Sequence, residues 1–285
     1  MSKTLIYNRV KDIHSWLSYA PQEAQYARYK TNIIFAGIKI SDLYASLCTA
    51  RSNLYYYELD DYGEISSKDA ISTLYTKSGF IENALMYYNI SVDLFWQVLW
   101  VYYNNFIADK LATEVLYQES IKDCNYPELL LGLTLCRDIK MREIVKGFFN
   151  KDSSYLAIRP LYNYLKHRGT YYIDGLGLND QKAMFNLKLN AKFYKDHELP
   201  VLDALEIPLV PRRELDLDNT AQLLEEFDKS FISYCEYVFS VLMAYDYLDK
   251  SCPMTKMLQY PLDHLDEIIE YNLSKKGLPE KPQGI

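Results

Sequence analysis

The feature that most constrains the fold of this chain is a long apolar stretch, residues 80 to about 106. Its apolar residues recur at every third or fourth position, as they do when one face of a helix is buried. They are Ala84, Leu85, Tyr88, Val92, Phe95, Leu99 and Tyr102. A face this continuous predicts a helix at the centre of a helical bundle. We expect Gly79 to end a shorter helix before it, capped by Ser66 or Ser67.

Helical spacing returns along most of the remaining chain. We expect one long helix, or two in line, over residues 22 to about 59. Further helices are expected over residues 109–122, 127 to about 147, 153–168, 219 to about 248 and about 262–275. Pro160 falls inside the third of these further helices and should kink it or begin a new segment. Asn219 or Thr220 should cap the fourth. Its apolar face is Leu224, Phe227, Phe231, Tyr234, Val238, Leu242 and Tyr245.

One segment, residues 169–213, follows a different pattern. Apolar and polar residues alternate over residues 185–192, which predicts one half-buried strand within a hairpin or loop excursion. The fold class is therefore mainly α. We expect a helical extension over residues 1–78, a helical core over 79–250 that contains this excursion, and a helix with a flexible tail over 251–285.

Composition excludes several classes of protein. The net charge of −7 argues against a protein that coats nucleic acid or an anionic membrane through its overall field, so any such contact must be local. The five cysteines are odd in number and form no C-x-x-C pair, which favours free thiols in a reducing compartment. Charges interrupt residues 1–17, and the apolar run 94–103 is too short to span a membrane. We expect a cytoplasmic protein that does not contact the membrane.

Chemically active side chains gather at the end of the helix expected over residues 153–168. Asn163 and His167 are four residues apart and so share a face, and Arg159 lies four residues before Asn163 on the same side. Lys166 and Arg168 add two cations beside His167, whose neutral form they favour. Gly169 can end the helix in a left-handed turn.

This segment resembles the motif of the HEPN superfamily, whose helical bundles carry Arg-Asn-x-x-x-His near the start of a late helix. The matching residues are Asn163 and His167, followed by the ending Lys-His-Arg-Gly of residues 166–169. Residues 82–97 are similar to the first long core helix of bacterial members. Tyr162 stands where the arginine of the family motif is normally found, so Arg159 or Arg168 would have to replace that arginine.

The resemblance implies a HEPN-like bundle and metal-independent cleavage of RNA, in which the ribose 2′-hydroxyl attacks the adjacent phosphate. His167 would move the proton, and Lys166, Arg168 or Arg159 would stabilise the charge on the phosphoryl oxygens. Asn163 would orient His167 or hold the phosphate. It also implies a homodimer in which two motifs face each other, no cofactor, and a protein partner or antitoxin that silences a harmful nuclease.

Other residues are weaker candidates for substrate contacts. Tyr162 adjoins the motif; Asp93 and Gln97 are polar residues on the most apolar helix and either hydrogen bond internally or reach the same groove as His167. Arg212 and Arg213 form a small basic loop that could contact RNA or a partner. Clusters around His197 and His264 resemble solvated surfaces, and we assign no metal.

Three functions stay open. The first is a ribonuclease or ribonuclease-like toxin acting in antiviral defence, and the second is a non-catalytic HEPN bundle that binds RNA, nucleotide or a protein. The third is a helical adaptor. A cleft that brings His167, Asn163 and a cation to within about 3–4 Å of one phosphate-sized space favours the first. A solvent-exposed His167 favours the other two. The same residues are also compatible with an ordinary solvated helix end, whose cations interact favourably with the helix dipole.

Overall fold

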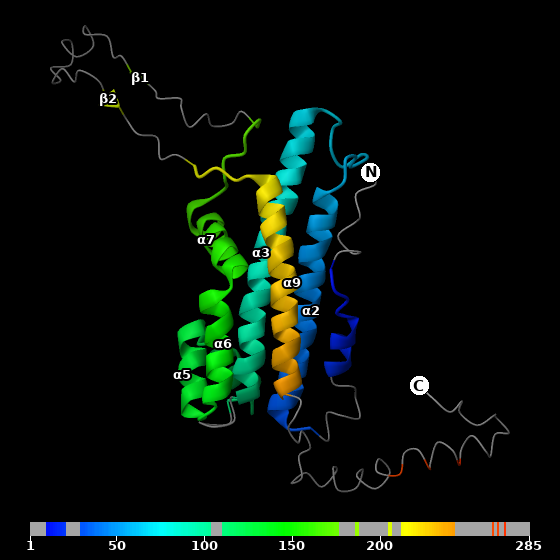
Figure 1. Ribbon diagram of the computed structural model, residues 1–285, viewed down its shortest axis with the longest axis vertical. Coiled ribbons are helices and arrows are strands. Elements are labelled where there is room, and N and C mark those ends of the chain that lie inside the picture. The colour runs from blue at the N-terminus through cyan, green and yellow to red at the C-terminus, as the bar shows by residue number, and fades with distance from the viewer. Residues whose placement is uncertain are drawn as a thin grey trace. The chain divides into compact units, whose positions relative to one another are not determined.

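The computed structural model describes residues 10–20, 29–103, 110–176, 186–187, 205–206 and 212–242, together with positions 264, 267 and 271. This part of the chain is mainly helical (Figure 1), which confirms the expected fold class. Its helices are η2 (His14–Tyr19), α2 (Thr31–Tyr57), α3 (Ala70–Tyr103), α4 (Glu114–Lys122), α5 (Tyr126–Leu135), α6 (Ile139–Lys151), α7 (Ser153–Arg168) and α9 (Leu217–Leu242). Two short strands, β1 (Asn186–Leu187) and β2 (Leu205–Glu206), pair antiparallel.

The chain divides into two compact units, which we describe separately. The first unit comprises Met1–Asp12, Ala45–Val92 and Lys146–Tyr234. The second comprises Ile13–Tyr44, Asp93–Val145 and Cys235–Ile285. The long helices α2, α3 and α9 contribute residues to both, so the expected division into an extension and a core stays a prediction.

A buried charge network joins three helices in the first unit. The guanidinium of Arg51 on α2 donates two hydrogen bonds to the carboxylate of Asp228 on α9, at 2.8 and 2.9 Å. The hydroxyl of Tyr88 on α3 donates to the same carboxylate at 3.0 Å. Arg51 is 4% exposed and the other two side chains are fully buried. The charges are therefore removed from water and satisfied by one another, as a buried ion pair requires.

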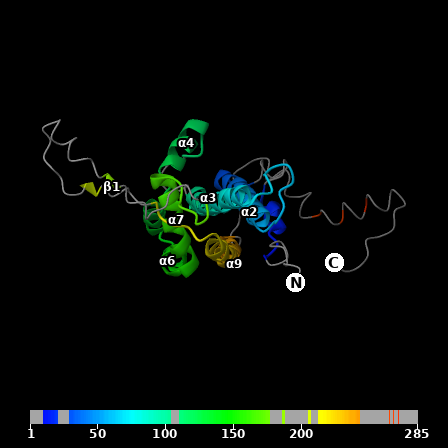
Figure 2. The same ribbon diagram turned by 90° about the horizontal axis from the view of Figure 1, so that it is seen from above.

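The apolar faces expected on α3 and α9 form the core around this network. Ala84, Leu85, Val92 and Phe95 are fully buried. Phe227 and Phe231 of α9 stack with ring centroids 5.0 Å apart, and Phe227 meets the ring of Tyr88 edge-on. Viewed end-on in Figure 2, α3 lies between α2 and α7 in this unit. The expectation that α3 is central is confirmed.

Aromatic side chains hold the second unit together. Trp16 of η2 is buried against Phe239 of α9, with ring centroids 5.2 Å apart. Trp100 of α3 donates a hydrogen bond to Ser120 of α4 at 2.9 Å. Tyr103 at the end of α3 donates to Asp138, the residue before α6, at 2.7 Å. The unit thus packs the short helices against the end of α3 largely through indole and phenol groups.

The expected helix end at Gly79 is wrong, because α3 runs unbroken from Ala70 to Tyr103. Asp69, rather than a serine, caps it by accepting a hydrogen bond from the Ser72 amide at 2.8 Å. Glycine inside a helix costs only about 1 kcal/mol relative to alanine. Phe80, the next residue, packs against the ring of Tyr56 at the end of α2, and such packing outweighs that cost.

The single helix expected over residues 127 to about 147 is two helices, α5 and α6. Arg137 between them adopts a positive φ of 58°, and Asp138 caps α6 by accepting from the Met141 amide at 2.9 Å. α6 then continues through Gly147. A break made by a non-glycine residue in the left-handed region leaves no composition signal, which is why the sequence pattern missed it.

Several other expected boundaries shift. α4 begins at Glu114, later than expected. α2 covers the later part of the helical stretch expected from residue 22, and residues 22–28 of that stretch lie outside the described residues. α9 begins at Leu217 and Asp216 caps it, by accepting from the Asn219 amide at 2.9 Å. α7 is one helix that contains Pro160. The strand expected over 185–192 is present as β1 alone within the described residues, and the final helix falls largely outside them.

By length and composition, α2 is the one helix of the described residues that could cross a membrane. About two fifths of its most apolar window (39%) is already buried inside the protein. Core helices of soluble proteins and membrane helices share this composition, so the absence of membrane contact stays a prediction.

We predict that Asp228→Ala lowers the free energy of unfolding by about 3–5 kcal/mol, because it leaves the Arg51 guanidinium buried without its carboxylate. Urea unfolding followed by circular dichroism measures the change. Lys68→Gln is the control, since it breaks an ion pair with Asp61 in which both side chains are largely exposed; it should leave stability unchanged. Equal effects of the two variants would show that the buried network contributes little.

Candidate functional site

The candidate motif lies at the C-terminal end of α7, and local interactions fix both ends of this helix. Asp152 caps its start by accepting a hydrogen bond from the Tyr155 amide at 2.9 Å. Gly169 ends it, as expected, with φ +95° and ψ −165°. This conformation is extended with positive φ, which glycine adopts at little cost. It differs from the left-handed helical turn that we expected.

The side chains matched to the HEPN motif are exposed on the surface of this helix end. Asn163, Lys166, His167 and Arg168 are all exposed. Within the described residues, His167 makes no hydrogen bond or ion pair. We call the residues Arg159, Tyr162, Asn163, Lys166, His167 and Arg168 the α7 stripe. On one chain the stripe is an open surface and does not enclose a phosphate.

The stripe also contains an ordered group of two cations and one aromatic ring. The guanidinium carbon of Arg159 lies 5.4 Å from the centroid of the Tyr162 ring, and the ammonium of Lys166 lies 5.9 Å from it. Both distances are typical of cation–π contacts. Arg159 also donates a hydrogen bond to the side-chain oxygen of Asn89, a fully buried residue of α3, at 3.2 Å. Arg159 is thus held at the base of the stripe, two helical turns before His167.

Asp93 and Gln97 belong to the second unit, whereas the α7 stripe belongs to the first. Both side chains are half-buried. The pKa of the Cys124 thiol is raised to about 12, mainly by burial and also by the negative charge of Asp93, while Lys39 acts in the opposite direction. The charge of Asp93 therefore acts on a neighbouring thiol of the second unit, and the choice between internal hydrogen bonding and a role in the groove of His167 stays a prediction.

Arg212 and Arg213 lie where the excursion rejoins the bundle. The amide of Tyr172 donates to the carbonyl of Arg213, and the amide of Leu215 donates to the carbonyl of Tyr172, each at 3.0 Å. The Arg213 amide also donates to the hydroxyl of Tyr164 on α7 at 2.8 Å. These hydrogen bonds join the chain after α7 to the chain before α9.

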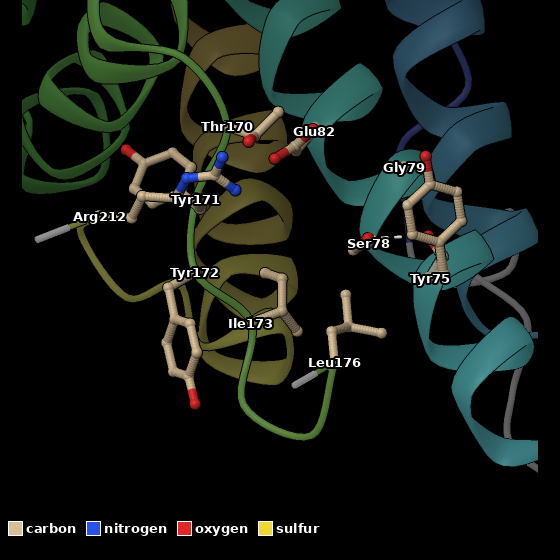
Figure 3. A pocket seen from close by; sticks show the side chains of 10 residues that line it. All are labelled: Tyr75, Ser78, Gly79, Glu82, Thr170, Tyr171, Tyr172, Ile173, Leu176 and Arg212. Atoms are coloured by element: carbon tan, nitrogen blue, oxygen red, sulfur yellow. Dashed lines mark hydrogen bonds between the residues drawn. The ribbon is translucent and has the colours of Figure 1, made fainter. Parts of the chain in front are cut away.

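A pocket of about 250 Å³ opens beside this junction. Figure 3 shows Arg212 and Tyr172 on one side and Tyr75 of α3 on the other, with Glu82 and Thr170 at the end between them. Thr170 is two residues after the last residue of α7. The pocket, which we call the Glu82 pocket, therefore begins where the α7 stripe ends along the chain.

The walls of the Glu82 pocket are held in place by hydrogen bonds. Tyr171 is buried, and its hydroxyl donates to the carbonyl of Leu161 at 2.7 Å while its ring packs on Tyr164. Burial raises the pKa of Glu82, and a hydrogen bond from the Tyr171 backbone to its carboxyl group opposes this shift. The pocket thus presents one oriented carboxyl group among tyrosine rings.

Sequence reasoning missed Glu82, Tyr75 and Tyr171 as functional candidates. A signal existed for Glu82, since it is an acidic residue between Ile81 and Ala84 on the most apolar helix of the chain. Only the fold brings it beside residues 170–172, about ninety positions later. Among the described residues, no three His, Cys, Asp or Glu side chains lie together as a metal site requires.

Comparison with known proteins adds no relative: no protein-family model, curated protein or solved structure matches this chain. The resemblance to the HEPN superfamily accordingly rests on residues 82–97 and 163–169 alone.

We predict that the stability contributed by neutral Tyr171 is lost at high pH. Burial raises the pKa of this phenol from 10.0 to about 12, with Tyr164 and Glu82 adding to the shift and Arg213 opposing it. The contribution is complete below about pH 10 and disappears as the pH rises towards about 12, because the unfolded chain releases the proton first. The free energy of unfolding of the wild type, measured in urea, should therefore exceed that of Tyr171→Phe by an amount that shrinks over this interval. A constant difference would contradict the raised pKa.

Proposed function

We propose that this chain is a HEPN-type helical protein that binds single-stranded RNA through the α7 stripe. The observation that supports this is that the guanidinium of Arg159 and the ammonium of Lys166 both lie within about 6 Å of the centroid of the Tyr162 ring, at 5.4 and 5.9 Å. Aromatic and guanidinium planes stack on unpaired bases, and adjacent cations neutralise phosphates, so this combination is typical of surfaces that hold single strands. Tyr162 stands where the family motif has arginine, and in this proposal it serves as a stacking platform.

The charge distribution fits a local contact. The whole chain carries a net charge of −7, yet residues 166–168 present lysine, histidine and arginine together at an exposed helix end. Binding should then involve few phosphates and weaken moderately with salt, by a slope of roughly 0.7 per phosphate contact for a single strand. The exposure of His167 supports a binding surface or an adaptor over an enclosed reaction site on one chain.

We predict that Tyr162→Ala weakens binding of a fluorescein-labelled single-stranded RNA by about 5- to 150-fold, the equivalent of one lost base stack. Fluorescence anisotropy at fixed salt measures the affinity. Tyr237→Ala is the matched control, because Tyr237 is 50% exposed on α9 and belongs to the second unit. Equal losses in the two variants, or none in either, would rule out the α7 stripe as the contact surface.

Cleavage of the bound RNA is the second candidate function, and the observation that favours it is that Asn163, His167 and the cations Lys166 and Arg168 share the last turns of α7. An exposed imidazole can accept the proton of a ribose 2′-hydroxyl, while Lys166 and Arg168 stabilise the phosphoryl oxygens. Because the stripe is open on one chain, an enclosed reaction site needs a second copy facing it. A toxin or defence protein of this kind would also need a silencing partner.

We predict that, if the chain cleaves RNA, activity on total RNA in EDTA leaves cyclic phosphate ends and disappears in His167→Ala. His14→Ala is the control, since His14 is an exposed histidine of the second unit. Light scattering on the same samples measures the fraction of dimer, with which the cleavage rate should increase. Negligible activity of the wild type, with intact RNA binding, would leave the non-catalytic function alone.

A further inference from the structure

We propose that the Glu82 pocket binds a guanine base. This proposal extends the proposed function, since it names a base that the bound RNA would place beside the α7 stripe. It rests on four features of the pocket: its volume, the one carboxyl group among its described lining residues, the tyrosines that line it and the arginine in the same lining.

The volume of the pocket is sufficient for one base. The pocket measures about 250 Å³, which is below the roughly 300 Å³ at which pockets for drug-sized ligands begin. A planar bicyclic base fills such a space, and its ribose and phosphate remain outside. Tyr75 and Tyr172 stand on opposite sides of the pocket in Figure 3. Tyr75 is 65% exposed, so its ring face is accessible for stacking.

The carboxyl group of Glu82 selects the base. Two adjacent N–H groups, N1–H and the 2-amino group, lie side by side on the Watson–Crick edge of guanine, and a carboxylate accepts both with its two oxygens. Adenine presents an acceptor at N1 and has no 2-amino group, so it cannot satisfy this geometry. The carboxyl group of Glu82 lies in the pocket lining beside the backbone of Tyr171.

Arg212 argues against a cationic ligand. A guanidinium group, such as an arginine side chain of a protein partner, also presents paired N–H donors to a carboxylate. Arg212 lines the same pocket and would repel that charge. A neutral base avoids the repulsion, and Arg212 then attracts the phosphate attached to it.

The chain path connects this pocket to the α7 stripe. α7 ends at Arg168, Gly169 turns the backbone with φ +95°, and residues 170–173 line the pocket. A strand whose phosphates contact Lys166 and Arg168 therefore has a base-sized pocket within the next few residues of the protein chain. Guanine recognition would give the RNA contact a sequence preference that phosphate contacts alone cannot provide.

The test is calorimetric titration of the full chain with guanosine, inosine and adenosine 5′-monophosphates. The expected order of affinity is guanosine, then inosine, which lacks the 2-amino group, then adenosine, with at least about tenfold between the first and the last. Glu82→Gln should reduce that ratio to within about threefold. Glu226→Gln, which removes an exposed carboxylate on α9, should preserve it; circular dichroism verifies that both variants are folded.

The other outcomes overturn the proposal or separate it from the proposed function. The proposal is overturned if no nucleotide binds or if the three nucleotides bind equally. It is also overturned if Glu82→Gln keeps the preference, or if free arginine binds in place of the nucleotides. A short uridine oligomer with one central guanosine is compared with its adenosine counterpart. If guanosine is preferred among the monophosphates but not in the oligomers, the pocket binds a free nucleotide and not a base of RNA. If Tyr162→Ala abolishes oligomer binding but neither oligomer is preferred, the proposed function is supported and the pocket proposal is refuted.

Discussion

The bidentate ion pair between Arg51 and Asp228 is the interaction on which the first unit depends. A buried charge is strongly destabilising unless it is paired with an opposite charge, so the pair fixes the position of α2 along α9. A slip of one helical turn, about 5.4 Å, would separate the two charges. Tyr88 ties α3 to the same carboxylate. The next residue, Asn89, then faces α7 and holds Arg159, so the position of the stripe follows from a pair in the core.

Periodicity in the sequence predicts the long helices well, because burial of one face imposes its spacing on the residues. The buried faces of α3 and α9 and both ends of α7 follow the expected pattern. Helix ends elsewhere were missed where a single side chain decides them, as Asp69 and Asp216 do by capping. Gly79 misleads because tertiary packing of its neighbour Phe80 overrides a local preference. Arg137 misleads because a left-handed residue other than glycine leaves no signal in the composition.

Prediction of the site succeeds for residues close together in the sequence and fails for those brought together by the fold. Helical spacing alone places Asn163 and His167 on one face. Nothing local indicates that Asn89 holds Arg159, or that Glu82 lies beside Tyr171. The tyrosine at position 162 can be interpreted only from the structure, which places two cations near its ring. By contrast, the sequence does contain a signal for the buried ion pair, since Arg51 and Asp228 carry opposite charges on otherwise apolar helix faces.

The hydrogen bonds that join Tyr172 to Arg213 and Leu215 close the base of the excursion. When two positions of a chain are held together, the entropic cost of closing the segment between them grows only with the logarithm of its length, by about 0.6 kcal/mol for each doubling. The stability of the bundle therefore depends little on the number of residues between the two joined positions. Homologous chains could lengthen, shorten or replace this segment while retaining the helices, which makes it the place where new specificity can evolve at the lowest thermodynamic cost.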